Sequence, residues 1–207
     1  MQIQKDYTKE VIKKSAQRLF LNKGFSKTSM RNIADASHVG LSNIYNYFKS
    51  KDELFYILVK PVICEITRMM IEHHNPQKTE YFIPLMTSLS EEFISSQVNE
   101  YMKIATQYHF QLKLLLFKSQ GSSLEFFFDR FADKCTIQVE RFLKSIGESY
   151  PNTKTSFSLF TIHIHTVWMF TFFREMIMHD IKPKDTRQII TEYITFECAG
   201  WKGLISR

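Results

Sequence analysis

Residues 28–54, TSMRNIADASHVGLSNIYNYFKSKDEL, restrict the possible folds of this chain more than any other stretch. Apolar residues recur there at helical spacing in two short blocks, Met30, Ile33 and Ala34, then Leu41, Ile44, Tyr45 and Phe48. Between the blocks, the run Ser-His-Val-Gly at residues 37–40 leaves room only for a tight turn. The stretch therefore predicts a helix-turn-helix, whose second helix would lie in the major groove of DNA.

Polar side chains on and around this stretch form the predicted DNA-binding set. The outward side of the second helix carries uncharged groups that hydrogen-bond base edges and phosphates: Ser42, Asn43, Tyr45, Asn46 and Tyr47. Thr28 and Ser29 precede the first helix, where their hydroxyls can cap it or contact a phosphate. Lys51 lies in the first turn of the following helix, beside backbone N–H groups that attract anions. We predict that Asn43 pairs with adenine, whereas Tyr45 and Lys51 hold phosphates.

The spacing of these residues resembles that of a known family. The pattern T-x-x-x-x-I-A-x-x-x-x-V-x-x-x-x-[IL]-Y-x-Y-F-x-S-K-x-x-L is met without a gap. It is similar to the DNA-binding signature of TetR-type (tetracycline-repressor-like) transcriptional regulators, and with the preceding helix it covers roughly the first quarter of the chain. The resemblance implies a homodimeric, ligand-controlled repressor with a divergent, all-helical C-terminal domain. It also implies that Lys51 touches the DNA backbone.

The chain departs from the family pattern at three positions of the turn and the second helix. His38 stands where the turn normally has Gly, Gly40 replaces the usual Ser or Thr cap, and Ser42 occupies a small-residue position. His tolerates a left-handed backbone better than most residues, and Gly as an N-cap costs only a few tenths of a kcal/mol. We therefore expect the helix-turn-helix to form despite these changes.

Composition favours an all-α protein with a basic head. The 207 residues include only 6 Gly and 5 Pro, and no run of alternating β-branched residues is present. The net charge of +6 is concentrated in residues 1–60, which hold eleven Lys/Arg against five Asp/Glu. A basic head on a neutral body is typical of a polyanion-binding domain joined to a second domain. A solvated basic helix face is the plainer alternative.

The predicted division is a helix-turn-helix DNA-binding domain at residues 1–50 and a helical ligand-binding and dimerisation domain at residues 51–207. Periodicity and capping signals predict helices over residues 8–22, 51–73, 80–97, 101–118, 123–146, 157–178 and 186–205. Ser50-x-x-Glu53 and Ser122-x-x-Glu125 have the form of capping boxes, and residues 147–151 have the composition of a loop. Pro61 predicts a kink or a short break in its helix.

Residues 157–178 include fourteen apolar side chains in twenty-two positions, on all sides of the predicted helix. Such a helix must be buried on more than one side. His163, His165 and the Arg174-Glu175 pair, without a flanking basic cluster, argue against a membrane span. We predict instead that the helix packs on its own core and on a partner subunit. The resemblance implies a homodimer through the last two helices.

Fifteen of the 19 Phe follow residue 60, so the body offers an aromatic interior that can hold an apolar effector. Aromatic side chains most often fill the core, and the candidates for pocket lining are Phe93, Tyr108, Phe127, Phe131, Trp168 and Phe172.

His163 and His165 point about 200° apart on a helix, so no metal site is predicted. Phosphate loops, nucleophile elbows and paired carboxylates are missing from the sequence, which predicts neither enzymatic activity nor a cofactor.

The three cysteines, Cys64, Cys135 and Cys198, lie among apolar neighbours, and the sequence shows no signal peptide. This predicts reduced, buried thiols in a cytoplasmic protein.

Taken together, the sequence predicts a ligand-responsive repressor that binds a near-palindromic operator as a homodimer. A small apolar or aromatic effector would release it. The alternative is a ligand-independent architectural or cell-division DNA-binding protein of the same fold, which a pocket filled by its own side chains would favour. A helical enzyme, the third class, has no catalytic constellation to support it.

Overall fold

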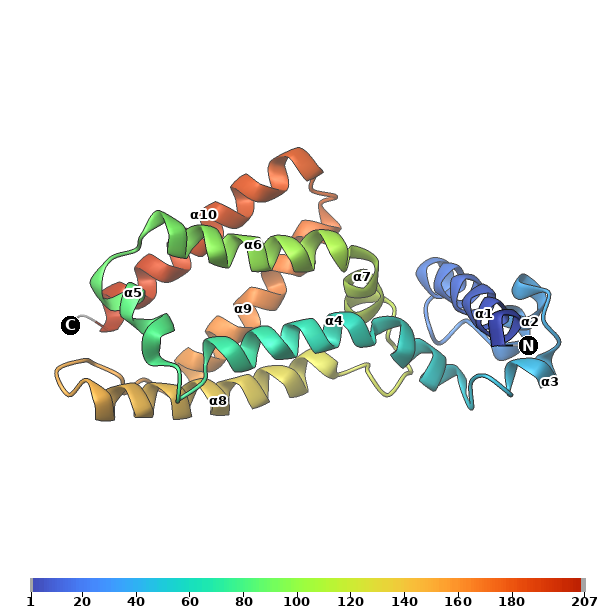
Figure 1. The fold of residues 1–207 in the computed structure, drawn as a ribbon, viewed down its shortest axis with the longest axis horizontal. Coiled ribbons are helices and arrows are strands. Elements are labelled where there is room, and N and C mark those ends of the chain that lie inside the picture. The colour runs from blue at the N-terminus through green and yellow to red at the C-terminus, as the bar shows by residue number, and fades with distance from the viewer. Residues whose placement is uncertain (1, 206–207) are drawn as a thin grey trace. The chain divides into compact units, whose positions relative to one another are not determined.

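The computed structural model describes residues 2–205, and this part of the chain is helical without any strand (Figure 1). The helices are α1 (Gln2–Lys23), α2 (Met30–Ser37), α3 (Leu41–Ile44), α4 (Lys51–His73), a 3-10 turn η1 (Thr79–Tyr81), α5 (Phe82–Thr87), α6 (Glu91–Gln107), α7 (His109–Phe117), α8 (Phe127–Ser149), α9 (Leu159–Met178) and α10 (Pro183–Ile205). The predicted all-α fold is confirmed.

The chain forms two compact units. The first comprises the chain up to residue 64 together with residues 108–127, and the second comprises residues 65–107 together with the chain from residue 128. The two parts of α4 therefore pack in different units, and α7 belongs to the unit that holds the helix-turn-helix. These units describe packing, whereas the boundary between residues 50 and 51 divides the chain by function and stays a prediction.

The first unit is built around a small aromatic core. Phe20 from α1, Phe25 from the following turn and Phe55 from α4 have ring centroids 5.2 to 5.9 Å apart. Gly24, with φ +80°, allows the chain to leave α1 and direct Phe25 back into this core. α7 is fixed to the same turn, because the Phe25 N–H donates to the Lys118 carbonyl at 2.9 Å. The core thus joins α1, α4 and the turn before α2.

α4 runs without a break through Pro61, so the short break does not occur, and the alternative of a kink stays a prediction. Pro61 lies on the exposed side of the helix, where water can serve the carbonyl that proline leaves unpaired. At the start of α4, Ser50 Oγ accepts from the Glu53 N–H at 3.0 Å. The Glu53 carboxylate, however, accepts from the Lys49 N–H rather than from Ser50, so the capping box is shifted by one residue.

The helix predictions between residues 80 and 149 need three corrections. The helix predicted at 80–97 is interrupted after α5, and α6 begins only at Glu91. The helix predicted at 101–118 is divided at Tyr108 between α6 and α7. The helix predicted from 123 begins at Phe127, because Ser122 and Glu125 close a turn in which Glu125 accepts from the Gly121 N–H at 2.9 Å.

Gly147 lies inside α8, which continues to Ser149, although a loop was predicted from this residue. A Cβ built at Gly147 would lie 2.5 Å from Thr155 Oγ1. The glycine therefore allows the segment after α8 to pack closely on the helix instead of ending it. Composition alone does not distinguish these two roles of a glycine near a helix end.

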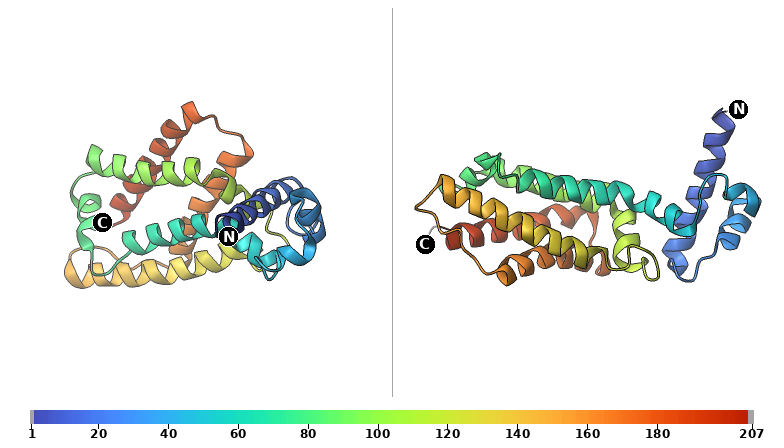
Figure 2. Two further views of the ribbon diagram at one scale, coloured as in Figure 1. Left: turned by 45° about the vertical axis from the view of Figure 1, so that its right-hand side comes forward. Right: turned by 90° about the horizontal axis from the view of Figure 1, so that it is seen from below.

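The second unit has two apolar clusters. One contains Phe82, Phe142, Ile146 and Ile205, and the other contains Val98, Met176, Ile190 and Ile194. α6 and α10 pack against each other. They cross at an angle, as Figure 1 and the left view of Figure 2 show. Of the three cysteines, Cys135 is buried and Cys198 is partly buried, but Cys64 is exposed, so its predicted burial is wrong.

Candidate DNA-binding head and effector cavity

The turn between α2 and α3 has the geometry of a helix-turn-helix. Ser29 caps α2 by accepting from the Asn32 N–H at 3.1 Å, and Asn32 Oδ1 accepts from the Ser29 N–H at 2.9 Å. His38 ends α2 in the left-handed conformation with φ 54° and ψ 30°. It takes the place of the usual glycine as expected. Gly40 is the N-cap of α3 and makes no side-chain capping bond.

α3 is only four residues long, and hydrogen-bonded turns extend it to Phe48. Ile44 and Phe48 are buried, which fixes the element on the core of the first unit. Ser42, Asn43 and Asn46 are exposed on the other side, and Asn46 Nδ2 donates to Asn43 Oδ1 at 3.3 Å. This side is therefore an uncharged hydrogen-bonding surface of the kind that base edges require.

The other predicted DNA contacts lie in different environments. Tyr45 is 49% exposed, whereas Tyr47 is partly buried. Thr28 is buried, and its hydroxyl donates to the Gly24 carbonyl at 2.8 Å, so it stabilises the turn before α2. Ser29 is exposed and engaged as the cap of α2. Contact of each of these residues with DNA stays a prediction.

Lys51 connects the start of α4 to the turn before α2. Its ammonium donates to the carbonyls of Phe25 at 2.8 Å and Thr28 at 2.7 Å, and it lies 4.0 Å from the centroid of the Phe25 ring. Burial lowers the pKa of this amine. Two of its three N–H donors are thus used inside the protein, which leaves one for a phosphate. Its predicted DNA contact is compatible with this arrangement and stays a prediction.

Three exposed cations near the helix-turn-helix were not among the predicted contacts. Lys27 precedes α2, Arg31 lies in its first turn, and Lys49 follows the turns after α3. The excess of positive charge in residues 1–60 indicated that such cations exist, but a count of charges does not show which of them contact DNA. Exposed cations in these places can contact the DNA backbone.

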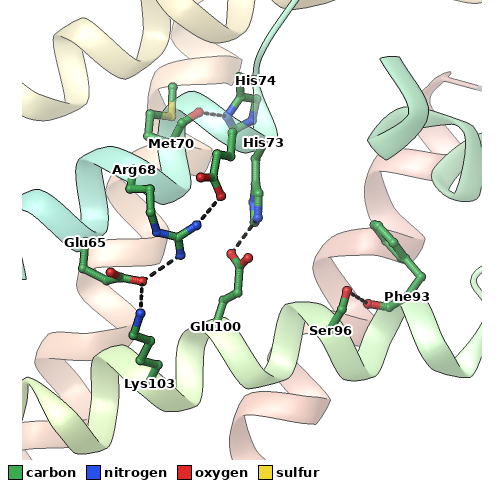
Figure 3. A network of polar contacts seen from close by, with 10 residues as sticks. Glu65, Arg68, Met70, His73, His74, Phe93, Ser96, Glu100 and Lys103 are labelled. Atoms are coloured by element: carbon green, nitrogen blue, oxygen red, sulfur yellow. Dashed lines mark hydrogen bonds and ion pairs between the residues drawn. The ribbon is translucent and has the colours of Figure 1, made fainter. Parts of the chain in front are cut away.

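In the second unit, charged side chains connect the last turns of α4 to α6 (Figure 3). The Glu65 carboxylate accepts from Arg68 at 2.7 Å and from Lys103 of α6 at 2.9 Å, and Arg68 also pairs with Glu72. His73 Nε2 lies 2.7 Å from Glu100 of α6. The hydrogen bond from Arg68 lowers the pKa of Glu65, so this buried carboxylate is charged at neutral pH.

A cavity of about 230 Å³ lies inside the second unit. Its apolar wall comes from α5, α8, α9 and α10, and includes Phe82, Leu85, Phe142, Leu143, Met169 and Trp201. Members of both apolar clusters line it, so the cavity occupies the part of the core that side chains leave unfilled. Its volume lies below the usual range of about 300–1,000 Å³ for ligand pockets, but its mainly apolar lining is typical of a site for a small organic molecule.

Polar groups of the lining come from the end of α4 and from α6, α9 and α10. His73 ends α4 and His74 follows it, Gln97 is on α6, His165 is on α9, and Glu197 is on α10. Burial lowers the pKa of His74 to about 4, and its Nδ1 lies 3.2 Å from the Met70 carbonyl. Burial also raises the pKa of Cys135 to about 12 and that of Cys198 to about 11, so both thiols stay protonated.

One of the six predicted ligand contacts, Phe93, lines this cavity. Tyr108 and Phe127 belong to the first unit. Phe131 packs on Phe170 with ring centroids 5.5 Å apart, Trp168 packs on Phe196 at 5.3 Å, and Phe172 stacks on Tyr193 at 4.1 Å behind the cavity wall. Sequence reasoning missed Glu197, which also lines the cavity. It is a carboxylate in the otherwise apolar stripe of Ile190, Ile194 and Trp201, and a charged residue on an apolar helix face was the pattern that could have identified it.

α9 presents apolar side chains to solvent in the single chain. Phe160 is 73% exposed, Ile164 is 45% exposed and Trp168 is 38% exposed, and Phe196 of α10 is 60% exposed. No helix in residues 2–205 is long and apolar enough to cross a membrane. Within the same residues, His, Cys, Asp and Glu do not form any group of three that could hold a metal ion.

Comparison with known proteins identifies the head. Residues 12–56 match the family model described as "Bacterial regulatory proteins, tetR family". The matched segment begins within α1 and ends in the second turn of α4, so it contains the complete helix-turn-helix. Among curated proteins, no match is found.

Several solved structures share the fold of the whole chain. FadR of Bacillus subtilis, in complex with stearoyl-CoA, is 15% identical over 92% of this chain and 98% of its own, with a TM-score of 0.61. NalD, the secondary repressor of the MexAB-OprM multidrug efflux pump in Pseudomonas aeruginosa, is 16% identical over 93% and 96%, with a TM-score of 0.57. A TetR-like transcriptional regulator from Rhodococcus sp. RHA1 is 14% identical over 93% and 96%, also at 0.57. Residues 12–56 therefore match the tetR family of bacterial regulatory proteins, and the chain as a whole shares the fold of these solved structures.

Proposed function

We propose that this protein is a cytoplasmic, ligand-responsive repressor. It binds a near-palindromic operator as a homodimer, and a small apolar or aromatic effector in the cavity of the second unit releases it. The cavity is the observation that carries this proposal, because an unfilled, mainly apolar space lies in the core of a chain that has a DNA-binding head. A ligand-independent architectural or cell-division protein has no use for such a space. FadR, which shares the fold, binds an acyl-CoA, and this is consistent with an effector site in the helical body.

The recognition surface of the head reads the operator. Asn43 is exposed at the start of the element that would enter the major groove, and an Asn amide can make two hydrogen bonds to adenine. Two heads in a dimer would reach successive major grooves, about 34–36 Å apart or slightly more. The effector then acts by binding more tightly to a dimer geometry whose heads no longer match this spacing.

The exposed apolar side chains of α9 and α10 support the homodimer. Phe160, Ile164 and Trp168 recur at helical spacing on α9, and Phe196 lies against Trp168. A contiguous apolar surface of this kind is typical of a protein–protein interface. Helices from two copies of the chain would cover it in one bundle.

The DNA-binding part of the proposal is tested with Asn43→Ala. An operator is first selected from random duplexes with the purified wild-type protein, and binding is then titrated on the operator and on a scrambled duplex. Asn43→Ala should weaken operator binding by about 1–3 kcal/mol and affect scrambled DNA much less, since the amide contacts bases. Asn22→Ala, an exposed asparagine on α1, is the matched control. Equal losses on both duplexes would assign Asn43 to the backbone instead.

The effector part is tested with a library of apolar and aromatic compounds. A true effector should raise the melting temperature of the protein and weaken operator binding together, because it binds one folded geometry selectively. Both tryptophans lie in the second unit, and Trp201 lines the cavity, so tryptophan fluorescence reports binding directly. Compounds that stabilise the protein but never change its DNA affinity would favour the ligand-independent alternative.

A further inference from the structure

We propose that the effector carries a protonated amine on an aromatic or aliphatic body, and that Glu197 holds the ammonium inside the cavity. This inference rests on the proposed function, since it assigns the chemical class of the molecule that occupies the same cavity. Three properties of the cavity carry it: an incompletely paired carboxylate, the balance of charges in the lining, and the aromatic faces beside the carboxylate.

Glu197 is a carboxylate placed in the apolar stripe of α10, where its side chain is 14% exposed. Its Oε1 is buried without a hydrogen-bond partner, and its Oε2 lies 3.5 Å from His165 Nδ1. That distance exceeds the ordinary length of a hydrogen bond between nitrogen and oxygen. A buried carboxylate with an unused oxygen is costly to a fold, and a donor from a ligand would remove this cost.

The charges of the lining favour a cationic ligand over an anionic one. None of the described residues that line the cavity is Lys or Arg. His73 is paired with Glu100 at 2.7 Å, and burial lowers the pKa of His74 to about 4, so His74 is neutral. His165, the third histidine of the lining, faces Glu197 itself at 3.5 Å. A carboxylate or phosphate in this space would therefore meet Glu197 without a Lys or Arg to balance it.

Aromatic rings near Glu197 complete a site for a cation. Trp201 lies one helical turn after Glu197, and its ring is 4.7 Å from that of His165 between centroids. Tyr101 and Tyr193 also line the cavity. Burial raises the pKa of both phenols, and the nearby charge of Glu197 adds to the shift, so both phenols stay neutral. Faces of Trp and Tyr attract cations, and the apolar wall beyond them accommodates the body of the ligand.

The inference is tested with three probes that share one body: phenylbutylamine, phenylbutanol and phenylbutyrate. Their binding to the full-length protein is measured by isothermal titration calorimetry, with tryptophan fluorescence as a second readout. The amine should bind about ten-fold or more tightly than the alcohol, as expected for a charge-assisted hydrogen bond, and the carboxylate should bind most weakly. Equal binding of the three probes, or preference for the carboxylate, would overturn the inference.

Two variants separate the role of Glu197 from general effects of charge. Glu197→Gln keeps the shape of the side chain and should abolish the preference for the amine over the alcohol while the alcohol still binds. Glu192→Gln removes the same charge from an exposed position of α10 and should leave the preference intact. An unchanged preference in Glu197→Gln would overturn the inference.

The proposed function can fail or stand independently of this result. A cavity that binds all three probes equally, with loss of operator affinity, would still be an effector site but not a site for amines. A protein that binds the amine tightly through Glu197, without any change in DNA affinity, would confirm the site and contradict its role in repression.

Discussion

His74 should make the second unit sensitive to mild acid. Its imidazole lies at the end of α4 with its ring edge-on to Phe142, at 5.7 Å between centroids, and it lines the cavity. Burial, together with neighbouring His73, lowers its pKa from 6.5 to about 4. The perturbation that tests this is His74→Gln, which removes the titrating group. Its amide can still donate to the Met70 carbonyl, which also accepts the backbone N–H of residue 74 at 3.2 Å.

The magnitude follows from the difference between the two pKa values. Well above pH 6.5 His74 is neutral in the folded and the unfolded chain, so it does not make stability depend on pH. As the pH falls through 6.5 toward 4, the unfolded chain binds a proton that the folded chain excludes, and stability is lost. Between about pH 7.5 and about pH 5, this linkage amounts to about 2 kcal/mol of unfolding free energy.

The assay is urea unfolding followed by tryptophan fluorescence at the two pH values, with protein concentration held constant because a dimer depends on it. Both tryptophans lie in the second unit, so the signal reports the unit that contains His74. The wild type and the control His109→Gln, which alters an exposed histidine of α7, should lose the same stability on acidification. His74→Gln should lose about 2 kcal/mol less. An equal loss in all three proteins would refute burial of a neutral His74.

Three further predictions concern the head and the dimer. Gly40→Ser should stabilise the head by about 0.5–1 kcal/mol in thermal unfolding, because Gly40 has an ordinary φ of −54°, its Cβ position is free, and Ser can cap α3. An unchanged or lower melting temperature would contradict this. Lys51→Met should cost about 1–3 kcal/mol by removing the hydrogen bonds to Phe25 and Thr28, and should speed hydrogen exchange in α2; exposed Lys49→Met is the control, and equal effects of the two changes would oppose this role of Lys51. Ile164→Glu should yield monomers that lose operator binding, and sedimentation at micromolar concentration that shows a monomeric wild type would exclude the interface.

Local sequence was sufficient to predict the head. Met30, Ile33 and Ala34, then Ile44 and Phe48, can be buried together only if a tight turn separates two short helices. The turn itself follows from local backbone preferences, since His38 adopts the left-handed conformation that a turn of this length requires. Because these interactions span few residues, periodicity and turn chemistry contain nearly all the information needed.

The boundaries of later helices depended on contacts that periodicity does not contain. Gly147 continues α8 because Thr155 packs against it, and Ser122 and Glu125 close a turn rather than start a helix. Pro61 does not break α4, because it lies on the exposed side of the helix. In each case a residue that is locally compatible with two structures is fixed by its surroundings.

The cavity was decided by tertiary structure alone. The sequence predicted an aromatic interior, but only the packing of six helices determines that Phe93 lines the space while Phe131 and Phe172 fill the core beside it. The contacts of Lys51 also depend on the folded chain. Its place in the first turn of α4 predicted a phosphate contact, whereas in the structure its ammonium also donates hydrogen bonds to two carbonyls of a turn more than twenty residues earlier. Helical spacing determines which residues share a face. What each face meets depends on the crossing of helices that are distant in sequence, and this is why Glu197 could be assigned a role only from the folded chain.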